Sequence, residues 1–177
     1  MQSVRNGLLN YKTRKILGNN NVARQTIAYK KAWEVGILYS VDDLQKHEMI
    51  KDFIKLLEKD VKKIEVLTYL GKDKENLEFR YNFFTISDFS FWGDPTADSI
   101  VKFAEKKFDF LLYLDLESNI YMENILARSQ ASCRIGGYYS DKQDFFELMV
   151  NVKENDQIRH LIDQMYHYIK IIKCPQI

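Results

Sequence analysis

The sequence predicts a single three-layer α/β domain with a mostly parallel sheet of about five to six strands, preceded by an N-terminal basic helical arm. Short apolar runs of strand length alternate with amphipathic helical segments. The connections between these runs are long enough to be the crossovers that parallel strands require. A length of 177 residues suits one domain. The predicted class of the body is therefore Rossmann-like.

The arm covers residues 1–33. Helical spacing runs over residues 2–17 and stops at the turn-forming cluster 18–21, and a second helical piece is predicted over 22–32. Residues 1–33 contain seven Lys or Arg and no acid, so residues 34–177 hold the other 19 of the 26 bases and all 25 acids. A basic arm thus precedes a slightly acidic Rossmann-like domain at 34–177.

The body alternates strands and helices in chain order. The predicted strands are 35–40, 64–70, 82–86, 108–115, 132–136 and 145–150. The predicted helices are 43–59, 97–107, 119–130 and 156–172. In 43–59, apolar residues recur every three to four positions, which indicates an amphipathic helix. The run 108–115 is apolar on both faces, as expected of a central parallel strand.

The sequence carries no sign of a membrane protein or of a disulfide framework. No window approaches the length of a membrane span and the N-terminus lacks the apolar run of a signal peptide, so the protein is expected to be cytoplasmic. Cys133 and Cys174 lack metal-ligand spacing and are interpreted as free thiols. Nucleotide-binding glycine motifs are absent. We predict no cofactor and no metal.

Ligands of open parallel sheets bind at the carboxyl ends of the strands, where several polar residues of this chain fall. The candidate ligand-binding residues are Ser40, Asp42, Asp115 and Asn119, with Trp92 of the loop 87–96 as a wall. Converging carboxylates can bind Mg²⁺. Asp, Ser and Asn are also the usual helix N-caps, however, and capping is the favoured interpretation.

The cations of the arm form a second candidate site. Arg5, Lys12, Arg14 and Lys15 are candidates to contact nucleic acid or an acidic partner. The alternative, which we favour, is that this helix face pairs with the acidic body of the same chain. The arm can also mediate homo-oligomer formation through its helices.

Two resemblances support the fold more than the function. Residues 82–95 (NFFTISDFSFWGDP), 108–136 and the terminal His167-Tyr168 resemble an uncharacterised family of small bacterial α/β proteins, over nearly the whole chain. Residues 108–137 are also similar to a strand–helix–strand unit in the N-terminal half of heptosyltransferase-like glycosyltransferases. This chain has no room for the sugar-nucleotide-binding half of those enzymes. That similarity therefore implies the architecture but not the catalysis.

Function is expected to be that of a non-catalytic binding or interaction module, with a small ligand or a protein as partner and the ligand site at the carboxyl edge of the sheet. One alternative is a small enzyme that acts on a phosphorylated or glycosyl substrate through the carboxyl-edge residues. Another is binding of RNA or an acidic surface through the arm.

Overall fold

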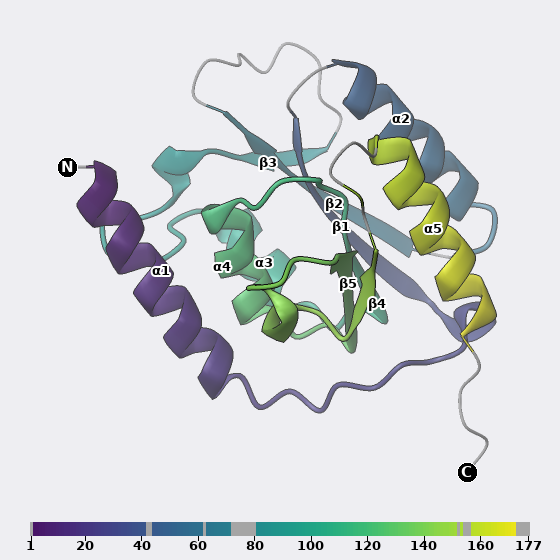
Figure 1. Ribbon diagram of the computed structural model, residues 1–177, viewed down its shortest axis with the longest axis horizontal. Coiled ribbons are helices and arrows are strands. Elements are labelled where there is room, and N and C mark those ends of the chain that lie inside the picture. Colours follow the sequence, from purple (N-terminus) through teal and green to yellow (C-terminus); the bar gives the residue numbers. More distant parts are fainter. Residues whose placement is uncertain are drawn as a thin grey trace.

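The computed structural model describes residues 2–41, 44–61, 63–71, 81–151, 153 and 157–172. They form a six-stranded sheet with helices on both faces (Figure 1). Every pairing between neighbouring strands is parallel. The predicted α/β class, the parallel sheet and the N-terminal helix are confirmed.

The elements lie close to the predicted ranges. The strands are β1 Glu34–Val41, β2 Lys63–Leu70, β3 Asn82–Phe84, β4 Phe110–Tyr113, β5 Cys133–Gly137 and β6 Leu148–Val150. The helices are α1 Gln2–Asn19, α2 Leu44–Leu57, α3 Asp98–Glu105, α4 Ile120–Arg128 and α5 Ile158–Ile171. Short 3₁₀ turns occupy Tyr29–Lys31, Ile86–Asp88 and Gln143–Phe145.

The strand order is β3-β2-β1-β4-β5-β6. From β1 the chain continues to β2 and β3 on one side, then returns to place β4 on the other side of β1. This reversal makes the carboxyl ends of β1 and β4 the topological switch point, where open α/β sheets bind their ligands. Leu38 pairs with Tyr113, the last residue of β4, and β1 continues to Val41, so the segment after β4 begins beside the last residues of β1.

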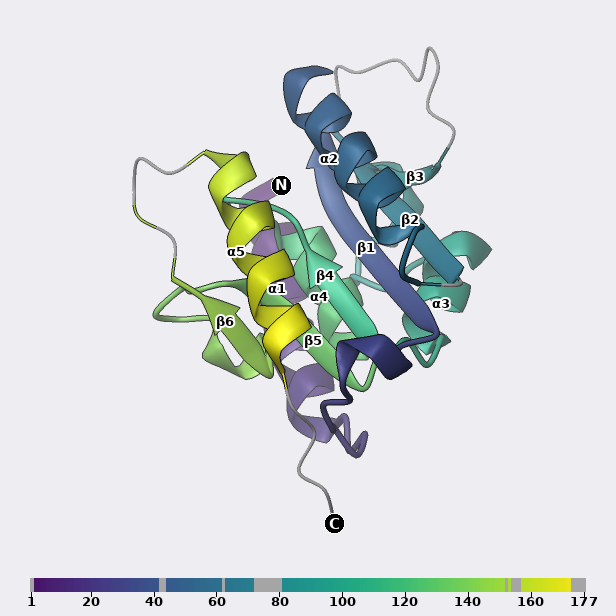
Figure 2. The same ribbon diagram turned by 90° about the vertical axis from the view of Figure 1, so that its right-hand side faces the viewer.

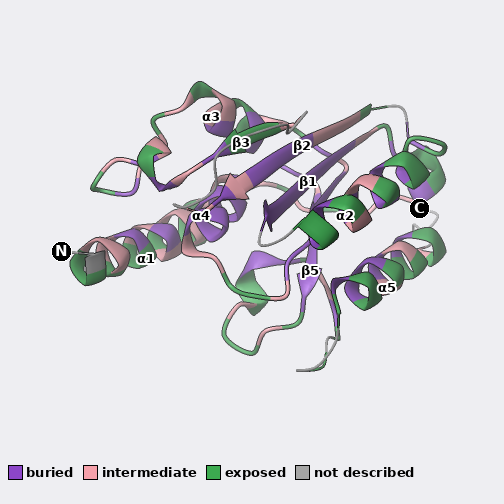
Figure 3. Ribbon diagram, turned by 90° about the horizontal axis from the view of Figure 1, so that it is seen from above, coloured by how far each residue is buried: buried purple, intermediate pink, exposed green. Residues whose placement is uncertain are grey.

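Helices α2 and α5 cover one face of the sheet, and α3 and α4 cover the other (Figures 1 and 2). Buried apolar residues of α2 and α5 pack on the first face, among them Ile50, Phe53 and Met165. Phe103 and Leu126 pack on the second face. All four residues of β4 are buried, which confirms its central position. Figure 3 shows buried residues along the strands and exposed residues on the outer sides of α2 and α5.

Two glycines let aromatic rings lie directly on the sheet. A Cβ atom at Gly36 would come within 2.8 Å of the Phe108 ring, and one at Gly136 within 2.4 Å of the Phe146 ring. Both distances are shorter than any side chain tolerates. The rings therefore occupy the space that side chains at these strand positions would take.

Helix α1 is a further layer outside α4, against which it packs (Figure 1). Leu9 of α1 is buried among the residues of the second face. The Thr13 hydroxyl accepts a hydrogen bond of 2.8 Å from the Asn124 side chain of α4, and both residues are buried. The first half of the arm thus packs on the body of its own chain.

The predicted helix over 22–32 is wrong, because residues 20–28 form no helix and only Tyr29–Lys31 make a 3₁₀ turn. The segment instead supplies donors to the end of α4. The Asn20 side chain donates to Ala127 O and Ser129 O, at 2.8 and 3.1 Å. Arg24 donates to Ser129 O at 2.9 Å and also to Ala131 O. These carbonyls at and beyond the helix end are satisfied by this segment.

Three strands are shorter than predicted, and of the run 108–115 only Phe110–Tyr113 forms β4. The run 82–86 forms a strand only to Phe84, because Thr85 starts a 3₁₀ turn. Its hydroxyl accepts from Ser87 N, while the Asp88 carboxylate accepts from Thr85 N at 2.7 Å. In the run 145–150, Phe145 closes another 3₁₀ turn, and the strand begins at Leu148. In these last two runs, some of the buried apolar residues lie in 3₁₀ turns rather than in strands.

A candidate ligand-binding site at the switch point

A pocket of about 500 Å³ lies at the carboxyl ends of β1 and β4. Its walls come from the first turn of α2, from the segment after β4 and from the start of α5. The polar residues of the lining are Gln45, Lys46, Asp115, Glu117 and Gln157, and the apolar ones are Met49, Leu116 and Ile158. A parallel sheet of this order is expected to bind ligands at this position.

A buried cluster of Ser40, Lys46 and Asp115 supports one wall of the pocket. Asp115 Oδ2 accepts hydrogen bonds from the Ser40 backbone N–H, at 3.1 Å, and from the Ser40 hydroxyl. Asp115 Oδ1 lies 3.1 Å from Lys46 Nζ and accepts from the Glu117 N–H at 3.3 Å. Lys46 Nζ also donates to Ser40 Oγ at 3.1 Å. The carboxylate thus has four donors.

The cluster joins three separate elements. Ser40 lies near the end of β1, Asp115 lies two residues after β4, and Lys46 lies in the first turn of α2. Asp115 is 3% exposed and Lys46 is 7% exposed. Ionised groups are stable at such burial only when they are paired and hydrogen-bonded. The observed geometry meets that requirement, so these contacts hold the two strand ends and α2 together.

Two tyrosines fix the segment that follows β4. The Tyr139 hydroxyl donates to Asp115 O at 2.9 Å, and the Tyr113 hydroxyl donates to Glu117 O at 2.9 Å. Burial, and then the negative charge of Asp115, raises the pKa of both phenols. Both therefore stay protonated donors at neutral pH and keep this pocket wall in place.

His47 follows Lys46 on α2 and is buried against Tyr39 of β1. Its Nδ1 and the Tyr39 hydroxyl are joined by a hydrogen bond of 2.8 Å. Burial, and then the nearby Lys51, lowers the pKa of His47. Burial raises the pKa of Tyr39 to about 12. The pair is thus neutral at neutral pH.

The structure brings together only some of the predicted carboxyl-edge residues. Ser40 and Asp115 are in direct contact. Asn119 is the N-cap of α4 and accepts from Tyr121 N and Met122 N at 3.0 and 3.2 Å, as the capping interpretation predicts. Trp92 is 65% exposed in the turn after Ser90 and is absent from the pocket lining. Asp42 lies outside the described residues.

The sequence contains a pattern that indicates a buried position for Lys46, although we did not predict it as a site residue. Lys46 precedes Ile50 by four residues and Phe53 by seven, so it lies on the core-facing side of α2. A lysine in that register must either extend to solvent or find a buried anion. In this structure Lys46 forms an ion pair with Asp115.

Three of the four candidate cations of the arm contact the rest of the chain. Arg5 donates to Ile86 O and Phe89 O at 2.9 and 2.8 Å. Lys12 pairs with Asp94, and Arg14 donates to Asp141 O at 2.7 Å. Lys15 is exposed. The Lys12–Asp94 contact joins a base to an acid, whereas these hydrogen bonds of Arg5 and Arg14 are to backbone carbonyls. Pairing of the arm with the acidic body therefore stays a prediction. Nucleic-acid contact and assembly through α1 stay predictions.

Cys133 lies in β5 and is a free, buried thiol, whereas Cys174 is outside the described residues. Burial raises the pKa of Cys133 to about 11, so about one thiol in a thousand is ionised at pH 8. We expect Cys133 in a Cys174→Ser background to resist a thiol reagent at pH 8 until urea unfolds the protein. Absorbance of the released chromophore measures this. Ser3→Cys in the same background is the accessible control, and rapid labelling of native Cys133 would contradict the prediction.

Metal-binding clusters and membrane-spanning helices are both absent from the described residues. Within that part of the chain, no group of three or more His, Cys, Asp or Glu side chains is placed to hold a metal ion. Likewise, none of the described helices has the length and apolar character needed to cross a membrane.

The strand order defines the protein as a Rossmann-like α/β domain, and the pocket lies at the switch point of its sheet. A family model described as a family of unknown function, DUF6913, matches residues 5–172. The chain therefore belongs to that family. No curated protein and no solved structure matches it. The similarity of residues 108–137 to glycosyltransferases is not shown by these comparisons.

Proposed function

We propose that this protein is a non-catalytic binding module that holds a small polar ligand in the switch-point pocket. The observation that carries the proposal is the pocket itself, which lies at the carboxyl ends of β1 and β4 and has a wall fixed by Ser40, Lys46 and Asp115. Its volume of about 500 Å³ is within the range of small-molecule sites.

The lining indicates what kind of ligand would fit. Gln45 and Gln157 present amide groups that both donate and accept hydrogen bonds. Met49, Leu116 and Ile158 offer apolar surface beside them. The charges of Lys46 and Asp115 offset each other, so they add little net charge. A small molecule with hydrogen-bonding groups on one side and an apolar portion on the other suits this lining.

The geometry of Asp115 favours binding over catalysis. A general base needs a lone pair directed at the substrate, but both carboxylate oxygens already accept two contacts each. The Ser40 hydroxyl donates to Asp115 and accepts from Lys46, which leaves it poorly placed to attack a substrate. These residues serve as the support of the pocket.

The proposal is tested by amide NMR titration of the whole chain with glucose, glucose 6-phosphate and adenosine. We expect at least one of the three to shift the amide signals of Gln45, Met49, Glu117 and Gln157. A Gln45→Trp variant should weaken that binding about tenfold or more, because the indole would occupy the pocket. Glu48→Trp is the matched control, since Glu48 is exposed on the same helix and does not line the pocket.

Three results would overturn the proposal. The first is binding that Gln45→Trp and Glu48→Trp change equally, and the second is no binding by any of the three compounds. The third is turnover of glucose 6-phosphate that a folded Asp115→Asn variant loses, which would support the enzyme alternative.

A further inference from the structure

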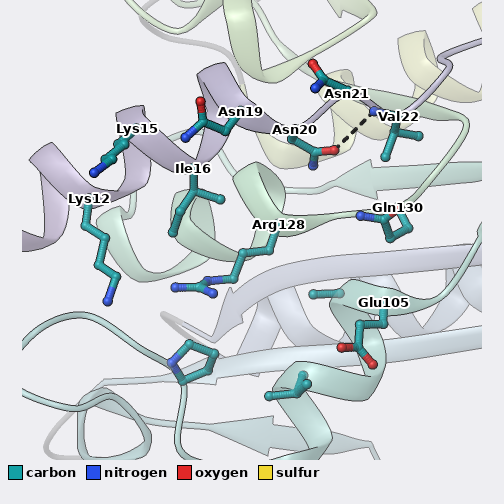
Figure 4. Close-up of a pocket in the computed structure, with 13 residues that line it drawn as sticks. Lys12, Lys15, Ile16, Asn19, Asn20, Asn21, Val22, Glu105, Arg128 and Gln130 are labelled. Carbon is teal, nitrogen blue, oxygen red and sulfur yellow. Dashed lines mark hydrogen bonds between the residues drawn. The ribbon is translucent and has the colours of Figure 1, made fainter.

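A second and larger cavity, of about 760 Å³, lies on the other side of the sheet. It is open to solvent and is lined by the C-terminal half of α1, the end of α4 and the helix α3 (Figure 4). Its apolar surface comes from Ile16, Val22, Pro95, Val101 and Ala104. The cavity shares no lining residue with the switch-point pocket.

Cationic side chains from two elements converge on this cavity. Lys12 of α1 and Arg128 of α4 both line it, and both pair with Asp94, Arg128 at 3.2 Å. Lys15 of α1 is a third cation of the lining, and Glu105 is its carboxylate. Three cations and two carboxylates, counting Asp94, leave one excess positive charge.

Several hydrogen-bond donors of the lining have no partner within the described residues. The side chains of Lys15, Asn19, Asn21 and Gln130 make no hydrogen bond or ion pair there. Backbone groups of the cavity wall, unlike these side chains, are already hydrogen-bonded, since Ala104 O accepts from Gln130 N at 2.8 Å. The Asn20 side chain likewise donates a hydrogen bond to Ala127 O at the end of α4. The wall thus offers the Lys15 ammonium as a donor and three amide groups that can each donate or accept a hydrogen bond.

We propose that this cavity binds a small phosphorylated molecule of the nucleotide class. Excess positive charge and donors suit the acceptor oxygens of a phosphate group. The apolar surface of Ile16, Val101 and Ala104 suits a flat, weakly polar base. The volume is within the range of small-molecule sites. A long nucleic acid is disfavoured because Arg5 and Arg14 are engaged within the chain.

The test is calorimetric titration of the full chain with adenosine monophosphate, with adenosine as the uncharged probe. We expect the monophosphate to bind at least about tenfold more tightly than adenosine, and its affinity to fall as salt is raised. In amide NMR, the monophosphate should shift the signals of Lys15, Asn19 and Gln130.

Variants separate the phosphate contact from a loss of folding. Arg128→Gln should weaken monophosphate binding about tenfold, and Lys15→Gln should weaken it about threefold. Lys15 is exposed and makes no hydrogen bond or ion pair with the described residues, so its variant remains informative if Arg128→Gln is unstable. Lys107→Gln is the control, since Lys107 is exposed and outside the lining. Asp94→Asn should tighten binding by removing a competing carboxylate.

Equal affinity for both probes would overturn this inference, as would binding that neither Arg128→Gln nor Lys15→Gln changes. Shifts confined to Gln45, Met49 and Gln157 would place the monophosphate in the switch-point pocket. That outcome would support the proposed function and overturn the second site.

Discussion

Replacement of Asp115 by alanine is expected to lower the free energy of unfolding by about 3–5 kcal/mol. The change removes the carboxylate that faces the buried Lys46 ammonium and accepts two hydrogen bonds from Ser40. A domain of this size has a total stability of roughly 5–15 kcal/mol, so the loss is severe. Urea denaturation followed by circular dichroism measures it.

Companion variants separate charge pairing from packing. Ser40→Ala removes one hydroxyl from the cluster, and we expect a loss of about 1–2 kcal/mol. Lys46→Met combined with Asp115→Leu should recover part of the loss, because an apolar pair of similar volume avoids burying charge. An Asp115→Ala variant as stable as the parent protein would show that the cluster does not hold the strand ends together.

Replacement of Leu9 by alanine is expected to lower the free energy of unfolding by about 2–5 kcal/mol. Leu9 is 1% exposed and packs on the face of the sheet that α3 and α4 cover. The shortened side chain would leave a cavity between α1 and the body. Urea denaturation of the full chain gives the difference.

Tyr11→Ala is the matched control on the same helix. Tyr11 is 71% exposed, so its replacement should change the stability by less than about 0.5 kcal/mol. If Leu9→Ala and Tyr11→Ala had equal and small effects, α1 would be a weakly attached appendage. Our division of the chain into an arm over 1–33 and a domain over 34–177 would then describe its energetics. A large effect of Leu9→Ala alone would make α1 part of the domain core.

The sequence predicted most of the architecture, because its strands and helices have strong periodic patterns. The run 108–115 is apolar at nearly every position, and β4 is accordingly buried on both faces. Helix α2 has a regular apolar stripe and begins and ends within two residues of the predicted range. The local sequence pattern was sufficient to predict these elements, because the apolar residues that form the pattern are the ones that the fold buries.

Segments stabilised by distant partners could not be predicted in the same way. Residues 22–28 have ordinary helical composition, yet the Arg24 side chain bonds to carbonyls of residues 129 and 131. No local pattern reports such contacts. The candidate site was predictable in part, because Ser40 and Asp115 end strands, whereas their contact with Lys46 depends on how α2 returns to the sheet. Trp92 has no local signal that places it in or out of the pocket.

The packing of α1 on α4 also sets an order of events during synthesis. Asn20 and its acceptor on Ala127 are 107 residues apart, and Thr13 and Asn124 are 111 residues apart. At ribosomal rates of about 5–20 residues per second, α1 emerges roughly 5–20 s before its partner exists. Throughout that interval Leu9 has no apolar surface of α4 to cover it. The nascent chain therefore carries Leu9 uncovered on a basic helix until most of the sheet has been made, which is the period when a chaperone would be most useful to it.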